Sequence, residues 1–169
     1  MSLANAELDR DIEKARHFQE SMLPRFTARL GVDLTFHFAP LARVGGGIYD
    51  VSEISKRHIR CFMGDVTGHG IQASMRTILL KSAYDRIKTH HSDPSATLNI
   101  LNRYLVREFP DGDLYCTACC VDIHLNPEGA ELVYANAGSA PLFVFSGSNH
   151  TDVRKYERRV TGRRAAALR

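Results

Sequence analysis

Two glycine-rich turns constrain this chain more than any other feature of its sequence. Three consecutive glycines at 45–47 precede a strand-like segment, and the sequence Gly-Asp-Val-Thr-Gly-His-Gly at 64–70 follows the next such segment. Glycine lets a backbone approach a ligand closely and adopt positive φ angles, and an aspartate at the end of a strand presents a hard oxygen ligand. The pattern therefore predicts a metal or phosphate site at these strand ends.

Only the second turn carries a carboxylate beside its glycine. Asp65 follows Gly64, whereas the matching position of the first turn is a third glycine, Gly47. Asp65 is a candidate metal ligand, and the adjacent carbonyl of Val66 can add an oxygen. The helix start after Gly70 offers free backbone N–H groups to an anion. The loop is not a Walker A motif, because no Lys-Ser/Thr pair follows the glycines.

The order of elements predicts an α+β domain. Apolar periodicity predicts helices at 4–22, 71–89 and 93–109 and strands at 32–39, 48–54, 58–66, 115–124, 131–136 and 141–145. Strands, then two helices, then further strands indicate α+β rather than alternating βαβ units. The apolar stripe of the second helix is expected to consist of Ile71, Met75, Ile78, Leu79 and Ile87.

Composition excludes several classes of protein. With 169 residues and 44% apolar residues, the chain can bury the core of one domain. No run approaches the roughly 18 apolar residues of a membrane span. The net charge of +3 arises from the basic segment after residue 153, and the rest of the chain is net negative. Nucleic-acid binding, which needs a basic patch on folded elements, is therefore not expected.

The four cysteines predict a buried strand rather than a metal site. Cys116 and Cys119 have the spacing of half a zinc site, but no second Cys/His pair stands at a suitable spacing. The segment reads as a core strand in which thiols are small apolar fillers. Free buried thiols predict a reducing, cytoplasmic compartment.

Several stretches, in order along the chain, resemble the SpoIIE/RsbU-type serine phosphatases, a bacterial branch of the metal-dependent protein phosphatases of the 2C type. They are 15–24, 39–51, 64–73, 101–102, 115–118 and 134–138. The resemblance implies two packed antiparallel β-sheets flanked by helices, an α-β-β-α sandwich that is incomplete at the C-terminus here. It also implies two Mn²⁺ or Mg²⁺ ions that activate a water to attack a phosphoserine or phosphothreonine.

The same resemblance assigns roles to the glycine turns. It makes Asp65 and the backbone carbonyl of Val66 metal ligands, and it marks Gly47 as the position where the family has a ligand aspartate. The remaining residues of the loops around metal and phosphate are Gly46, Thr67, Gly68, His69 and Gly70.

Further departures from the family pattern predict weak metal binding and little hydrolysis. Ser139 replaces a family histidine, and the later Thr-Asp-Gly segment, whose aspartate closes the metal cluster, is not found in the sequence. Asp50 is not expected to replace the ligand missing at Gly47, because residues an odd number apart in a strand face opposite sides.

The chain is expected to have three parts: a helix in 1–24, a partial phosphatase-like domain in 25–147 and an irregular basic tail in 148–169. The helix either packs on the domain as an amphipathic helix or connects it to an upstream sensor or receiver, with homodimer formation through it. The expected substrate is a phosphorylated regulatory protein such as an anti-sigma-factor antagonist. Two alternatives are a non-catalytic pseudophosphatase that docks a partner-switching regulator and an altered form of an active enzyme.

Overall fold

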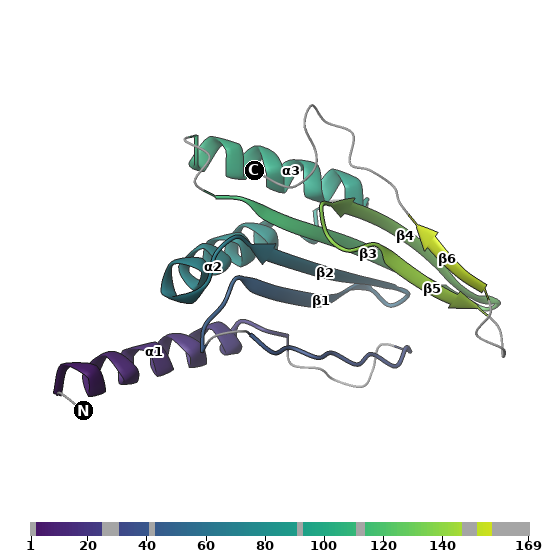
Figure 1. Ribbon diagram of the computed structural model, residues 1–169. Coiled ribbons are helices and arrows are strands. Elements are labelled where there is room, and N and C mark those ends of the chain that lie inside the picture. The colour runs from purple at the N-terminus through teal and green to yellow at the C-terminus, as the bar shows by residue number, and fades with distance from the viewer. Residues whose placement is uncertain are drawn as a thin grey trace.

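The fold is built on one antiparallel sheet with helices on one side (Figure 1). The structure, a computed structural model, describes residues 3–24, 31–40, 43–90, 93–110, 114–146 and 152–156. Its helices are α1 (Leu3–Ser21), α2 (Gly70–Ile87) and α3 (Pro94–Glu108). Its strands are β1 (Gly47–Ser55), β2 (His58–Val66), β3 (Cys116–Asn126), β4 (Gly129–Ala137), β5 (Leu142–Ser146) and β6 (Asp152–Tyr156).

Strands β1 to β4 pair antiparallel in sequence order, and β5 and β6 form a second, two-stranded sheet. The links within the larger sheet are hairpins at β1–β2 and β3–β4, while α2 and α3 lie between β2 and β3 in the chain. The predicted α+β order is therefore confirmed, with strands on both sides of a helical pair. The helix at 93–109 starts as expected, because the Asp93 carboxylate accepts hydrogen bonds from the backbone N–H of Ser95 and Ala96.

The main core lies between the sheet and the helices α2 and α3. The buried sheet residues alternate along each strand, as expected for a strand with one face on a core. The core side chains that are fully or almost fully buried include Phe62, Leu80, Tyr84, Leu98, Leu101 and Leu105. The Phe62 and Tyr84 rings stack with their centroids 4.0 Å apart, which fixes α2 against β2.

The other face of the sheet is apolar and only partly covered. A cavity of about 500 Å³ lies between this face and β5. It is lined by side chains of β2, β3 and β4, among them Met63, Val121 and Tyr134, and by Leu142 to Phe145 of β5. The smaller sheet therefore lies over the face turned away from α2 and α3, as in a two-sheet sandwich.

The segment 32–39 differs from its prediction. Val32, Leu34, Phe36 and Phe38 are partly buried, so the predicted alternation of faces is present. The segment is nevertheless not a strand, because no neighbouring strand pairs with it among the described residues. Its aromatic side chains contact β1 instead: the Phe36 ring stacks on the Tyr49 ring at 4.9 Å. Apolar alternation predicted the exposed and buried sides correctly but not the backbone hydrogen bonding.

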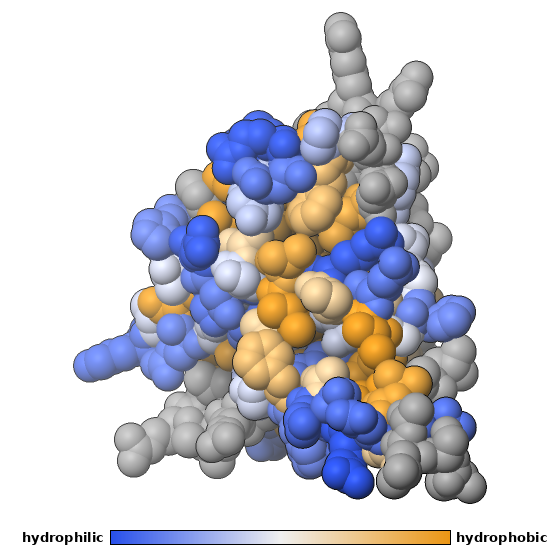
Figure 2. All heavy atoms as spheres, turned by 90° about the vertical axis from the view of Figure 1, so that its left-hand side faces the viewer, coloured by the Kyte–Doolittle hydropathy of each residue, from blue (hydrophilic) through white to orange (hydrophobic). Residues whose placement is uncertain are grey.

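The predicted apolar stripe of α2 is wrong for three of its five residues, whereas Ile78 is partly buried and Ile87 packs against the core. Ile71, Met75 and Leu79 are 45%, 62% and 43% exposed. The buried side of the helix consists of Ala73, Ser74, Thr77, Leu80, Lys81, Ala83 and Tyr84. Figure 2, which views the molecule from the side of α1 and α2, shows apolar side chains gathered between hydrophilic areas.

A buried ion-pair group explains why the charged Lys81 of α2 faces the sheet. Asp50 of β1 is 3% exposed, and its carboxylate lies 3.1 Å from Lys81 Nζ and 3.2 Å from Lys88 Nζ. Burial alone would raise the pKa of Asp50, but the Ser52 hydroxyl and the two lysines outweigh it and hold that pKa below its ordinary value. Lys81 also pairs with Asp85 one turn along α2, but Asp50, its partner on the sheet, is distant in sequence, and helical periodicity cannot reveal it.

The tail prediction is wrong for the residues of β6, because this strand pairs with β5 inside the segment expected to be irregular. The remainder of 148–169 lies outside the described residues. The prediction of free thiols at core positions holds for Cys116 and Cys120, which are fully buried. Burial raises the pKa of the Cys116 thiol to about 12. None of the helices in the described ranges has the length and apolarity needed to cross a bilayer.

Candidate functional site

The strand register brings the two glycine turns together. Gly47, the first residue of β1, is paired directly with Asp65 near the end of β2. Residues paired across an antiparallel sheet point to the same face. The position at which the sequence lacks a carboxylate is therefore next to the carboxylate that it keeps. This confirms the expectation that both turns belong to one place in the fold.

Gly46 is in tight contact with the second turn. A methyl group placed on Gly46 would lie 2.1 Å from the carbonyl oxygen of Val66 and 3.3 Å from Asp65 Oδ1. The Val66 N–H donates to the Gly46 carbonyl oxygen at 3.0 Å. The candidate oxygens of Asp65 and Val66 therefore converge on this glycine, which can tolerate no side chain. A methyl group on Gly47 would meet only ordinary contacts, 3.4 Å from Phe38 and 4.0 Å from Asp65 Oδ1.

This contrast gives a matched pair of variants. We expect Gly46→Ala to lower the free energy of unfolding by about 1–3 kcal/mol, because its methyl group must displace the Val66 backbone. Gly47→Ala is expected to change it by less than about 1 kcal/mol. Urea unfolding followed by circular dichroism measures both. Equal effects of the two variants would contradict the close contact at Gly46.

A cavity of about 370 Å³ opens beside this pair of turns. Asp65 and Gly47 line it, together with Thr117 of β3 and Ser139 after β4. The walls also include His37 and the aromatic rings of Phe36, Phe38 and Tyr49. Asp65 is exposed and so faces a solvent-accessible space. Among the predicted site residues, Asp65 and Gly47 line this cavity, whereas the loop at 67–70 does not.

Sequence reasoning did not select His37, Tyr49 or Thr117 as site residues. Thr117 is paired with Asp65 across β2 and β3, so it shares the face of Asp65. A correct strand register, had it been known, would have identified both Thr117 and Gly47 as neighbours of Asp65. His37 lies in the segment 31–40, which pairs with no strand among the described residues, and no sequence pattern would have placed it at the cavity.

The second turn has a backbone conformation with positive φ angles at two of its glycines. Gly68 and Gly70 have φ angles of +106° and +74°, which disfavour residues with a side chain. His69 precedes α2 in an extended conformation and makes no side-chain cap hydrogen bond. The Thr67 N–H donates to the Tyr115 carbonyl oxygen at 2.9 Å. The loop therefore leads directly into the N-terminus of α2, where backbone N–H groups lack intrahelical partners.

The first turn is fastened to two helices. Gln19 of α1 is 3% exposed, and its side-chain amide donates to the Gly45 carbonyl oxygen at 2.7 Å. The Gly45 N–H donates in return to Gln19 Oε1 at 3.3 Å. The Thr77 hydroxyl of α2 lies between two acceptors, 3.0 Å from the Gly46 carbonyl oxygen and 2.8 Å from that of Ala73. Helices α1 and α2 therefore both hold the glycine turn in position.

Asp50 lies on the wrong side of the sheet to serve the site. Its register partner is Phe62, which belongs to the core beneath the helices, while Gly47 pairs with Asp65 on the other face. The carboxylate is moreover engaged by Lys81 and Lys88. The parity argument that excluded Asp50 as a replacement ligand is confirmed.

The described residues do not fit a pair of divalent ions at the cavity. Mg²⁺ and Mn²⁺ prefer oxygen ligands, and a two-metal centre needs several carboxylates to hold both ions. The first turn has no carboxylate on the cavity face, because Gly47 occupies the position beside Asp65. Within the described ranges, the one group of three or more metal-ligating side chains lies elsewhere, at the other end of β2. Asp65 and the Val66 carbonyl suit one weakly held, hydrated ion.

The sequence is similar to that of a curated phosphatase and to one protein family. The chain is 26% identical to the phosphoserine phosphatase RsbP of Bacillus subtilis over 146 residues, which cover 83% of this chain and 36% of that protein. It therefore spans about a third of the length of this curated relative. Residues 55–161 match the family described as Stage II sporulation protein E. The matched range extends past residue 147, where the sequence predicted that the domain ends.

Solved structures support the fold. The SiaA-PP2C domain of Pseudomonas aeruginosa superposes with a TM-score of 0.78 at 23% identity, covering 99% of this chain and 65% of that one. The PP2C phosphatase domain of SpoIIE from Bacillus subtilis gives 0.54 at 23% identity, covering 67% and 32%. The RsbU and RsbW domains of a Mycobacterium tuberculosis protein give 0.55 at 22% identity, covering 70% and 32%. The predicted α-β-β-α fold is thereby confirmed, and the chain belongs to the SpoIIE family of PP2C-type phosphatase domains.

Proposed function

We propose that this chain is a metal-dependent serine/threonine phosphatase-type domain of a bacterial signalling regulator and that its catalysis is impaired. The observation that carries the proposal is the cavity formed by Asp65 beside the paired glycine turns. Its exposed carboxylate and the adjacent Val66 carbonyl are suited to a hard divalent cation. The chain belongs to a family of phosphatase domains, and this cavity joins such a ligand to its glycine motif.

The proposed substrate is a phosphoserine on a regulatory protein of the anti-sigma-factor antagonist type. RsbP is named a phosphoserine phosphatase, and one solved relative combines RsbU and RsbW domains. In this family a bound Mn²⁺ or Mg²⁺ supplies an activated water. Here Asp65 would hold the ion, while Thr117 and Ser139 offer hydroxyls toward a phosphoryl group in the cavity.

Impairment follows from the position of Gly47. A second carboxylate at this position would lie beside Asp65, since a methyl group there is 4.0 Å from Asp65 Oδ1. Without it, one carboxylate must balance the charge of any bound cation. We therefore expect weak metal binding and slow turnover rather than a change in the kind of reaction.

The direct test is Mn²⁺-dependent phosphate release from a phosphoserine-bearing anti-sigma-factor antagonist and from p-nitrophenyl phosphate. We expect slow release by the unmodified chain and a further loss of about tenfold or more in Asp65→Asn. The substitution keeps the size of the exposed side chain but removes its charge, so folding should be unchanged. Rapid release that is equal in both proteins would contradict the proposal.

A second candidate function is a non-catalytic module that binds a phosphorylated regulator. The glycine at position 47 favours it, because the cavity is kept while the metal ligand beside it is absent. Isothermal titration calorimetry with the phosphorylated and unphosphorylated regulator would distinguish the two functions. Preferential binding of the phosphorylated form without any Mn²⁺-dependent release supports the binding module.

We propose that α1 contacts either an upstream domain or a second copy of the chain. An upstream sensor or receiver and a homodimer through this helix are both supported by its exposed apolar residues. Leu8 and Phe18 are each 55% exposed, although Gln19 of the same helix is buried against the first glycine turn. A cytoplasmic location, inferred from four free thiols, stays a prediction.

A further inference from the structure

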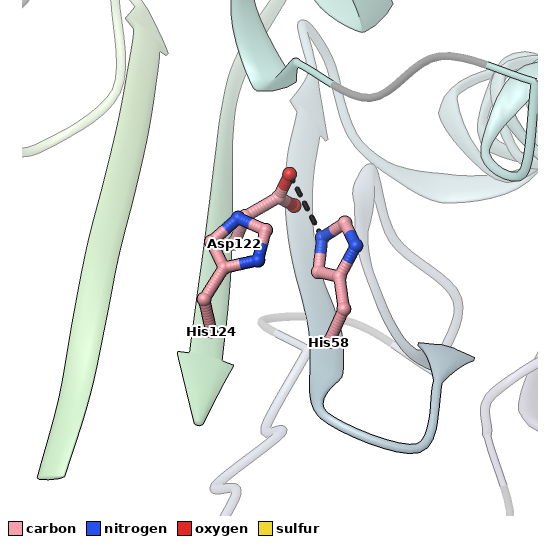
Figure 3. A group of neighbouring side chains, drawn as sticks. All are labelled: His58, Asp122 and His124. Atoms are coloured by element: carbon pink, nitrogen blue, oxygen red, sulfur yellow. Dashed lines mark ion pairs between the residues drawn. The ribbon is translucent and has the colours of Figure 1, made fainter. Parts of the chain in front are cut away.

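A second cluster of metal-ligating side chains lies at the far end of β2. Figure 3 shows His58 at the start of β2, facing Asp122 and His124 of β3. His58 is the register partner of His124, and Asp122 stands two residues earlier on the same face of β3. One ligand atom from each of the three side chains can be chosen so that all lie within 4.8 Å of one another.

The two imidazoles are held close together by the sheet. Their ring centroids are 4.2 Å apart and the ring planes are inclined by 32°. His58 Nε2 lies 3.0 Å from Asp122 Oδ2, but this contact lacks hydrogen-bond geometry. The nitrogen is buried and has no hydrogen-bond partner among the described residues. A buried polar atom without a partner is costly, and a coordinated cation would satisfy it.

Arg60 fixes the orientation of the Asp122 carboxylate. It is fully buried, and its two oxygens each accept a hydrogen bond from Arg60 at 2.6 Å. Such a partner orients a ligating carboxylate, as the outer residues of metal sites do. The guanidinium also neutralises the carboxylate, so the site offers little net negative charge. Hard, oxygen-seeking ions such as Mg²⁺ and Mn²⁺ are therefore disfavoured.

We propose that His58, Asp122 and His124 form a binding site for a borderline transition-metal ion, with Zn²⁺ as the reference ion. Two imidazole nitrogens and one carboxylate oxygen are a ligand set that suits Zn²⁺, Ni²⁺ or Cu²⁺. His58 and His124 are both partly exposed, which lets an ion enter and water complete its coordination. Antiparallel pairing preforms the site without any movement of the backbone.

The cluster is separate from the cavity at Asp65. Seven residues of an extended strand separate His58 from Asp65, which corresponds to roughly 23 Å. The side chains also project from opposite faces of the sheet, because the two positions differ by an odd number. Zinc binding here is therefore independent of the proposed phosphatase function, and either can fail without the other.

The test is Zn²⁺ binding by the full chain after removal of metals with a chelator. Isothermal titration calorimetry against Zn²⁺ alone should reveal one ion bound at this cluster. His58→Gln and His124→Gln should each weaken it by about tenfold or more. Co²⁺ provides a spectroscopic check, because imidazole coordination gives visible absorption bands that the two variants should lose.

His17→Gln is the matched control, since this exposed histidine of α1 lies near Glu13 and would reveal adventitious surface binding. It and Asp65→Asn should leave the Zn²⁺ affinity unchanged. Circular dichroism of the metal-free variants confirms folding, and Zn²⁺ should raise the unfolding midpoint of the unmodified chain but not of His124→Gln. Absence of Zn²⁺ binding, or an affinity that both cluster variants leave unchanged, overturns the proposal.

Discussion

Gly47→Asp is expected to strengthen Mn²⁺ binding by about tenfold or more and to raise Mn²⁺-dependent hydrolysis of p-nitrophenyl phosphate with it. The new carboxylate would stand directly across the ladder from Asp65 on the cavity face. The backbone at Gly47 accepts a side chain, because the nearest atom to an added methyl group is 3.4 Å away. Two adjacent carboxylates then share the charge of a divalent cation, which one carboxylate cannot balance alone.

The matched control for this variant is Gly47→Asn, which has nearly the same size but no charge. It should bind Mn²⁺ no better than the unmodified chain. The double variant Gly47→Asp/Asp65→Asn should lose the gain, because the two carboxylates act together. Without metal, like charges on paired positions repel, so Gly47→Asp should lower the unfolding midpoint until Mn²⁺ is added. Equal Mn²⁺ affinity in the aspartate and asparagine variants would refute the assignment of this position.

Arg60→Leu is expected to lower the free energy of unfolding by about 3–5 kcal/mol. Arg60 and Asp122 are both fully buried and joined by two hydrogen bonds of 2.6 Å. Arg60 also donates to the Lys88 carbonyl oxygen at 2.8 Å and to Thr97 Oγ1 at 2.9 Å. Removal of the guanidinium leaves a buried carboxylate without its counter-charge, and this unpaired charge accounts for most of the expected loss of stability.

Urea unfolding of metal-free protein measures this effect. Asp11→Asn is the control, because it breaks the ion pair of Asp11 with Lys14, whose side chains are 63% and 78% exposed. That change should stay within about 1 kcal/mol. The double variant Arg60→Leu/Asp122→Leu should recover part of the loss by removing the unpaired charge. A loss of less than about 1 kcal/mol in Arg60→Leu would show that the buried pair contributes little.

Periodicity predicted most of the fold because the sheet has one buried face. The strands at β1 to β5 and the helices α1 to α3 all fall where apolar spacing indicated them. It failed on α2, where Lys81 faces the sheet because Asp50 is 31 positions earlier in the chain and across the core. It also failed on β6, whose five residues include two basic ones and show no apolar alternation.

The candidate site was partly predictable because its chemistry lies in two short motifs. Residue type alone identifies Asp65 and the glycines as candidate site residues. It also shows that position 47 carries a glycine instead of a carboxylate. The neighbours supplied by register were not predictable. Thr117 meets Asp65, and His58 meets His124, because antiparallel pairing aligns positions that are about 50 to 65 residues apart. A single sequence does not record such pairings.

The two hydrogen bonds between Gln19 and Gly45 couple the position of α1 to that of the first glycine turn. Both ends of the Gln19 amide are engaged with the Gly45 backbone, and the turn is the same one that packs against the Val66 carbonyl. A shift of the helix along its axis must either break two hydrogen bonds or carry the turn with it. The distance between the two glycine turns beside the cavity therefore depends on the position of α1, a helix outside the sheet.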